Sequence, residues 1–141
     1  LGSFKCKCGN SSIDDLSSFL KQSKKLPITN YRDTFTIVGS RSHMSTETEM
    51  YFLSMKEKFN KVKILSVGSS LKLCMVAEGK ADVYPRYAPT MEWDTAAGDA
   101  ILRAAGGMVF HPDGKIYLYG KQNYRNTPFI AYGQLTSSTN A

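Results

Sequence analysis

The sequence predicts a layered α/β domain, with a largely parallel sheet and helices on both faces. Short apolar, β-branched runs of strand length alternate with amphipathic stretches of helix length along most of the chain. Several strand-like runs lead directly into glycine and polar residues, as strands do where the chain turns into a helix. The chain has 141 residues, of which 42% are hydrophobic, and this is enough for one domain with its own core.

The first part of the chain predicts a short helix and a strand. Residues 12–20 combine a serine or aspartate cap with apolar residues about one helical turn apart, so we expect an amphipathic helix that ends before Pro27. The run 35–38 is apolar and β-branched, and we expect a strand that ends at Gly39.

A longer helix and a second strand are expected next. Residues 46–58 place apolar side chains at helical spacings, with Ser45 or Thr46 as the N-cap. The run 63–67 predicts a strand that leads into Gly68.

The middle of the chain predicts another helix and a short strand. Residues 71–78 carry the apolar residues of a helix, and Gly79 provides its stop. The run 81–84 predicts a strand, which the following Pro85 assigns to a sheet edge or a strand end because proline cannot donate to a ladder.

The last part of the chain predicts a helix, a hairpin and a final strand. The helix covers residues 94–105, with Gly106 as its left-handed C-terminal residue. The runs 108–110 and 116–119 flank a Pro-Asp-Gly turn and are expected to pair as a hairpin. The run 129–132 predicts the last strand.

Composition limits the kinds of partner. The formal net charge is +6, but the basic residues are not interleaved with aromatic side chains, so the charge does not indicate a nucleic-acid polymer as partner. A positive field that attracts a small anionic ligand accounts for the charge equally well. Cys6, Cys8 and Cys74 do not fit a four-ligand zinc site. We expect reduced thiols in a cytoplasmic protein, either free in the cytoplasm or at the cytoplasmic face of the membrane. No apolar run approaches the length of a membrane span.

Three polar clusters follow expected strands, where ligands bind in open α/β sheets. They are residues 39–43, residues 68–72 and Asp94 at the head of its helix. In the second cluster, glycine allows a sharp turn, Ser69 and the first-turn amides can face an anion, and Lys72 adds a full charge if its side chain turns back. The alternative is that a serine only caps the helix and the lysine is solvated.

Single residues of these clusters allow more than one interpretation. His43 could shuttle a proton, contact a ligand or be a structural histidine. Arg86 suits a bidentate contact with phosphate, and the alternative is an ordinary surface arginine. Asp94 could be an N-cap that contributes about 1 kcal/mol, or a cation ligand. The small residues 96–98 and Ala100 predict a helix packed close to its sheet, which would hold the carboxylate rigidly.

These motifs together resemble the inositol monophosphatase superfamily of Mg²⁺-dependent phosphatases. The segments Trp93–Gly98 and Ala105–Gly107 are similar to the C-terminal signature of that superfamily. Within it, the bacterial 3'(2'),5'-bisphosphate nucleotidases are most similar, over Gly39–His43, Gly68–Lys72, Val76–Gly79 and Tyr84–Arg86. True inositol monophosphatases usually lack the lysine of the second cluster and the Tyr-Pro-Arg.

The resemblance implies a reaction and a set of roles. The reaction would be hydrolysis of the 3'-phosphate of adenosine 3',5'-bisphosphate by a metal-activated water, which gives AMP and phosphate. Asp94 would bind one catalytic Mg²⁺. The residues that would hold the nucleotide and its uncleaved phosphate are His43, Gly68, Ser69, Lys72 and Arg86.

The resemblance also implies a missing partner. The N-terminal lobe of the family supplies a metal-binding glutamate and an Asp-Pro-Leu-Asp-Gly-Thr motif, and neither motif occurs in the chain. The chain would then be the C-terminal lobe of the sugar-phosphatase fold: residues 1–30 an irregular lead with the short helix of the inter-lobe connection, 31–133 the α/β lobe and 134–141 a polar tail. With Asp94 as the only recognised ligand, we expect very weak Mg²⁺ binding and no phosphatase activity from this chain alone. An isolated lobe also exposes surface that its partner covers, which favours self-association.

Three alternatives stay open at this point. The chain could belong to a phosphatase for inositol or sugar phosphates, although Lys72 and Arg86 count against that substrate class. It could be a nucleotide-binding module without catalysis. It could also be an interaction domain in which the polar clusters are only caps and turns.

Overall fold

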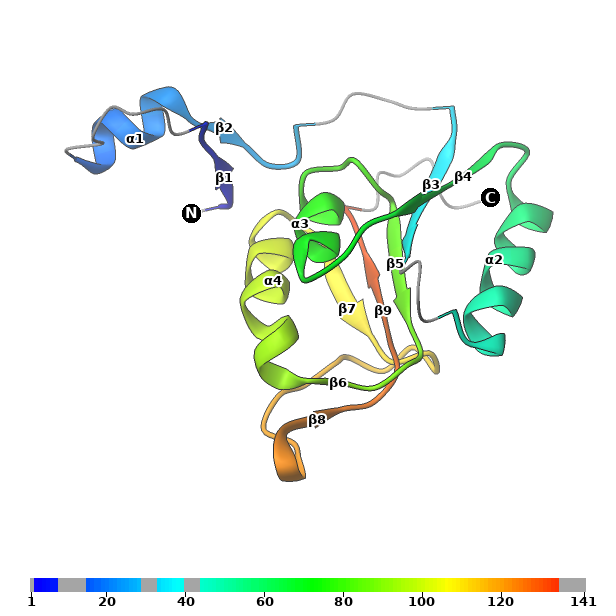
Figure 1. The fold of residues 1–141 in the computed structure, drawn as a ribbon. Coiled ribbons are helices and arrows are strands. Elements are labelled where there is room, and N and C mark those ends of the chain that lie inside the picture. The colour runs from blue at the N-terminus through cyan, green and yellow to red at the C-terminus, as the bar shows by residue number, and fades with distance from the viewer. Residues whose placement is uncertain (1, 8–14, 29–32, 40–43, 135–141) are drawn as a thin grey trace.

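A five-stranded sheet forms the centre of the protein in a computed structural model that describes residues 2–7, 15–28, 33–39 and 44–134. The strand order is β4-β3-β5-β9-β7 (Figure 1). The strands are β3 (Phe35–Gly39), β4 (Val62–Ser66), β5 (Val83–Arg86), β7 (Met108–Phe110) and β9 (Phe129–Tyr132). Strand β3 pairs in parallel with β4 and β5, whereas β9 is antiparallel to both of its neighbours. The predicted α/β class is confirmed, with one reversed strand inside the sheet.

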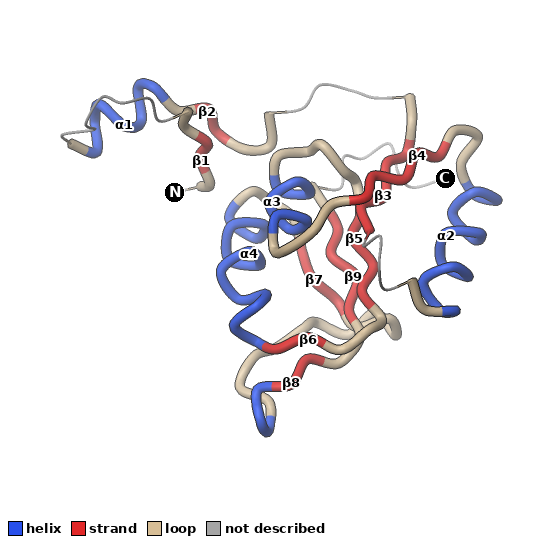
Figure 2. Tube along the Cα trace, in the orientation of Figure 1, coloured by secondary structure: helices blue, strands red, loops and turns tan. Residues whose placement is uncertain are grey.

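Helices cover both faces of this sheet. Helix α2 (Thr46–Lys58) lies on one face, and α3 (Leu71–Ala77) and α4 (Glu92–Ala104) lie side by side on the other (Figure 1). Helix α1 (Leu16–Gln22) projects away from the sheet, next to the short antiparallel pair β1 (Phe4–Lys5) and β2 (Lys24–Lys25) (Figure 2). The predicted caps are found at Asp15 for α1 and Ser45 for α2, where each side chain accepts a backbone N–H.

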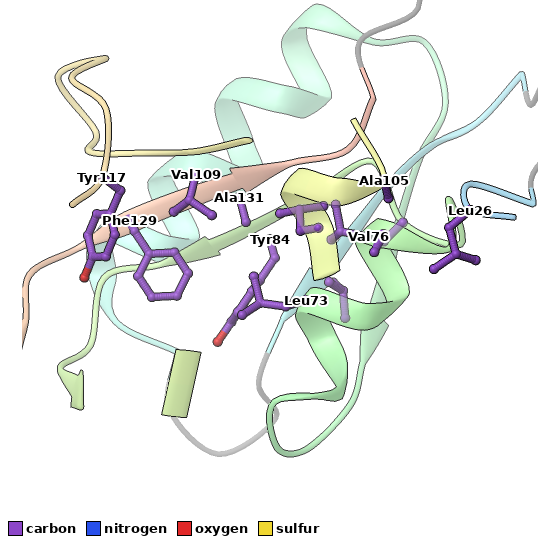
Figure 3. Packing of buried hydrophobic residues seen from close by; sticks show 13 residues of the cluster. Leu26, Leu73, Val76, Tyr84, Ala105, Val109, Tyr117, Phe129 and Ala131 are labelled. Carbon is purple, nitrogen blue, oxygen red and sulfur yellow. The ribbon is translucent and has the colours of Figure 1, made fainter. Parts of the chain in front are cut away.

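The larger core cluster lies between the sheet and the helix pair α3–α4 (Figure 3). It includes Leu73, Tyr84, Leu102, Val109 and Phe129, all buried. A second cluster lies under α2 and joins Phe52 and Met55 to strand residues. Alternate residues of the strands therefore face alternate helix layers, as a sheet covered on both sides requires.

A small antiparallel pair lies at the start of α4. It consists of β6 (Thr90–Met91) and β8 (Arg125–Asn126), and the 3₁₀ turn η1 (Gln122–Tyr124) directly precedes β8. The sequence did not predict these elements because each has only two or three residues.

Two sequence expectations about strands were wrong. The strand expected at residues 81–84 is β5 at Val83–Arg86, and it lies in the middle of the sheet rather than at an edge. Pro85 is tolerated near the carboxyl end of this strand because β5 pairs with β3 only at Ile37–Val83, so the proline interrupts no pairing with β3. The run 116–119 forms no strand and has a single bridge, Phe110–Ile116, since the carbonyl of Tyr117 accepts a hydrogen bond from Arg103 instead (2.9 Å).

The close packing of α4 also differs from expectation. Ala96, Ala97 and Ala100 are exposed, and the close contact is made by Gly98 against helix α3 rather than against the sheet. A Cβ at Gly98 would lie 2.7 Å from Leu73 Cδ1. Gly106 has the expected positive φ of 90° beyond the end of the helix.

Candidate functional site

The turn between β4 and α3 is open to solvent. Gly68, Ser69 and Ser70 are all exposed, and a Cβ at Gly68 would meet no atom within 4 Å. Ser69 has a left-handed φ of 63°, a conformation that is strained for a residue other than glycine. Ser70 takes the N-cap position, but its hydroxyl makes no capping hydrogen bond. The serine-cap interpretation therefore does not account for the hydroxyls of this turn.

Lys72 turns back from α3 toward this same turn. Its Nζ donates to the carbonyl oxygens of Ser69 (2.9 Å) and Val67 (3.2 Å), and the side chain is 5% exposed. Burial, with a smaller contribution from the positive charge of Arg86, lowers the pKa of Lys72 below its ordinary value. The ammonium group is thus held beneath the turn rather than solvated.

Arg86 lies at the carboxyl end of β5, close enough for its charge to act on Lys72. Its Nε donates to the carbonyl of Ala88 at 3.1 Å. In the part of the chain that the structure describes, this is the only hydrogen bond of the guanidinium group, so its two terminal nitrogens are available to an anion.

Tyr84 lies close to the charged groups of the site. Lys72 Nζ is 5.2 Å from the centre of its ring, and the ring meets Phe129 edge-on at 5.5 Å. Burial raises the pKa of Tyr84 to about 12, while Arg86 acts to lower it and Asp94 acts to raise it. The charges of both Arg86 and Asp94 therefore act on the pKa of the Tyr84 hydroxyl. The sequence predicted no role for this tyrosine, although it belongs to the Tyr-Pro-Arg motif.

Asp94 lies in the first turn of α4, which begins at Glu92 rather than at Asp94. Its Oδ2 accepts a hydrogen bond from the backbone N–H of Met91 at 2.9 Å, and the side chain is exposed. The carboxylate of Asp94 thus accepts the backbone N–H of the residue that precedes the helix, whereas an N-cap side chain accepts N–H groups within the helix. Carboxylate oxygens are suitable ligands for Mg²⁺.

The described residues do not form a complete metal site. No three His, Cys, Asp or Glu side chains among them lie close enough together to hold a metal ion. Asp94 fits one ligand position of an oxygen-coordinated cation and cannot bind it firmly alone. His43 and the rest of its polar cluster after Gly39 lie outside the described residues.

A separate pocket lies near the other end of α3. It has a volume of about 360 Å³ and its lining includes Lys5, Lys24, Glu78 and Lys80. Lys5 and Lys80 both pair with Glu78, at 2.6 and 2.9 Å. This lysine pocket contains none of the candidate site residues. None of the helices in the described ranges combines the length and the hydrophobicity of a membrane span.

Comparisons with known proteins identify a family that this chain matches. The model of the inositol monophosphatase family matches residues 7–139. The 3'(2'),5'-bisphosphate nucleotidase CysQ of Escherichia coli (strain K12) is 42% identical over 92 residues, which are 65% of this chain and 35% of that protein. An uncharacterized protein encoded in the pss 5' region of Rhizobium leguminosarum bv. phaseoli is 56% identical over 77 residues, 50% of this chain and 81% of that protein.

A solved structure shows the same similarity in three dimensions. The crystal structure of CysQ from Bacteroides thetaiotaomicron, a bacterial member of the inositol monophosphatase family, matches with a TM-score of 0.86 at 45% identity. The match covers 96% of this chain and 51% of that one. The chain thus spans about half the length of this structure, and its match to the Escherichia coli nucleotidase about a third.

Proposed function

The chain belongs to the inositol monophosphatase family, and we propose that it is the nucleotide-recognising half of a metal-dependent 3'(2'),5'-bisphosphate nucleotidase. The observation that carries this proposal is the pair of cations beside one open turn. Lys72 is held beneath the Gly68–Ser70 turn, and Arg86 lies close enough to lower its pKa. Two neighbouring cations fit a nucleotide that carries two phosphates better than an inositol or sugar phosphate that carries one.

Each residue of the site has a role in this proposal. Lys72 and Arg86 bind the phosphate that is not cleaved, the first as a point charge and the second through its terminal N–H groups. The absence of a side chain at Gly68, together with the exposed hydroxyl of Ser69, gives the nucleotide access to the turn. A contact between His43 and the nucleotide is also part of the proposal, although His43 lies outside the described residues.

The proposed reaction is hydrolysis of a phosphomonoester. Water attacks the 3'-phosphorus of adenosine 3',5'-bisphosphate, the bond to the 3'-oxygen breaks, and AMP and phosphate are released. Mg²⁺, when bound, would stabilise the charge that develops on the phosphate and the leaving oxygen. Asp94 would contribute one carboxylate to it, pre-oriented by the hydrogen bond from Met91.

We assign the remaining metal ligands to an N-terminal lobe. Two facts support this assignment: the described residues hold no cluster of three metal-ligating side chains, and the chain spans about half of the Bacteroides thetaiotaomicron structure. In this arrangement residues 31–133 form the C-terminal lobe, and residues 1–30 belong to the connection between lobes.

Isothermal titration calorimetry on the 141-residue chain tests the recognition step without requiring turnover. We expect adenosine 3',5'-bisphosphate to bind at least about tenfold more tightly than adenosine 3'-monophosphate, which lacks the uncleaved 5'-phosphate, or inositol 1-phosphate, since one additional charge-assisted hydrogen bond contributes about 1.5–3 kcal/mol. The variants Lys72→Met and Arg86→Met should each abolish this preference. Lys63→Met, which removes an exposed lysine of β4, is the matched control for net charge.

The other outcomes assign the site differently. Tighter binding of inositol 1-phosphate would favour a phosphatase for inositol or sugar phosphates. Preferential bisphosphate binding that Lys72→Met leaves unchanged would refute the assigned site.

A further inference from the structure

A buried side-chain amide joins the start of α4 to the distant β8 strand. Asn126 is 3% exposed, and its Nδ2 donates to the carbonyl of Met91 (2.8 Å) and to the hydroxyls of Thr90 (3.0 Å) and Thr95 (3.0 Å). These partners are 31–36 positions away in the sequence. The side-chain amide of Asn126 therefore joins strand β6 to the first turn of α4.

A second buried contact fixes the segment that carries Asn126. Glu92 is 8% exposed, and its Oε1 accepts hydrogen bonds from the backbone N–H of Lys121 (2.9 Å) and from Lys121 Nζ (3.3 Å). Lys121 Nζ also lies 4.0 Å from the ring centre of Tyr117 and 3.5 Å from Asn126 Oδ1. The first helical residue of α4 and the loop before β8 thus form one polar network.

Met91 transmits this network to the candidate metal ligand. Its carbonyl accepts from Asn126, and its N–H donates to Asp94 Oδ2 at 2.9 Å. Both polar groups of one residue are therefore fixed, one by a buried amide and the other by the carboxylate. A loss of the first bond lets the backbone of Met91 move, which loosens the second.

We propose that Asn126 is a positioning residue that orients the carboxylate of Asp94 through the backbone of Met91. The functional meaning of this contact rests on the role proposed above for Asp94. The contact itself does not depend on any ligand, so it can be tested separately. A carboxylate that is held in one orientation before the cation arrives loses less conformational freedom on binding.

Amide hydrogen exchange on the full 141-residue chain, read by NMR, tests the proposal at the Met91 N–H. Asn126→Asp keeps the shape of the side chain but removes its N–H donors. We expect Met91 to exchange at least tenfold faster in this variant, while the amides of Val38 and Ala131 in the central sheet exchange as in the unaltered chain. Asp94→Ala is the positive control, because it removes the acceptor of the Met91 N–H directly.

A matched control and a second variant complete the design. Gln122→Ala alters an exposed side chain of the same segment and should leave Met91 exchange unchanged. Asn126→Ser, a smaller polar residue, should reproduce the effect of Asn126→Asp. An increase shared by Val38 and Ala131 would mean that Asn126 supports the whole fold and would overturn the proposal, as would a change at Met91 below twofold. A failure of the proposed nucleotidase function would appear instead as absent nucleotide binding, with the Met91 effect intact.

Discussion

The close approach of α3 and α4 at Gly98 provides a quantitative prediction. Replacing Gly98 by Ala introduces a Cβ at 2.7 Å from Leu73 Cδ1 and 2.8 Å from Leu73 Cβ. The first atom can move with the side chain, but the second is fixed to the backbone, so the helices themselves must separate. Because Lys72 lies on α3 and Asp94 on α4, the same contact sets the spacing of the candidate site.

Two opposing effects decide the size of the change. Alanine is favoured over glycine inside a helix by about 1 kcal/mol. Overpacking of a core typically costs about 1–3 kcal/mol, and the fixed Cβ contact favours the upper end of that range. We therefore expect Gly98→Ala to lower the free energy of unfolding by about 2 kcal/mol and the melting temperature by roughly 5–10 °C.

Urea denaturation followed by far-UV circular dichroism measures this difference. Ala97→Gly, at an exposed position of the same helix, is the matched control and should lose about 1 kcal/mol through helix propensity alone. If Gly98→Ala is as stable as the unaltered chain, or more stable, the close-packing argument is wrong.

Three further predictions concern charge, pH and activity. Lys72→Met should weaken the binding of adenosine 3',5'-bisphosphate at least about tenfold in calorimetry, because a cation–phosphate contact is worth about 1.5–3 kcal/mol, and an unchanged dissociation constant would refute its role. Burial raises the pKa of Tyr84 from 10.0 to about 12, so its contribution to stability is fully present below pH 10.0 and is lost as the pH rises through about 12. Over this range the unaltered chain should lose on the order of 2–3 kcal/mol more than Tyr84→Phe in urea titrations, and parallel curves would contradict the assignment. The chain alone, with millimolar Mg²⁺ and adenosine 3',5'-bisphosphate, should release no phosphate above background in a colorimetric assay, since Asp94 is its only recognised metal ligand; turnover by the purified chain would refute this prediction.

Much of the fold could be predicted because its signals are local. The start of α2 follows from Ser45, and the stop after α4 from Gly106, since a cap and a left-handed glycine act on their immediate neighbours. The position of β5 could not be predicted, because the penalty for Pro85 depends on how far β3 continues beside it. The face of α4 that packs closely could not be predicted from local sequence either, since it depends on contact with Leu73 of another helix.

Part of the candidate site could likewise be predicted from the sequence, and part could not. The motifs predicted which residues are chemically suited, but the direction of the Lys72 side chain depends on the carbonyl oxygens of Val67 and Ser69, which only the folded turn brings near. The position of Tyr84 beside Lys72 results from the packing of β5 against α3, which links residues that are distant in the sequence. The role inferred for Asn126 had no sequence signal, because its acceptors are more than 30 residues away.

A ¹H–¹⁵N NMR titration of the chain with adenosine 3',5'-bisphosphate tests most directly whether the turn before α3 binds the nucleotide. We expect the largest amide shifts at Gly68–Lys72 and at Arg86. Largest shifts in the lysine pocket around Lys5 and Lys80, or no shifts in the Gly68–Lys72 turn at saturating nucleotide, would contradict this expectation.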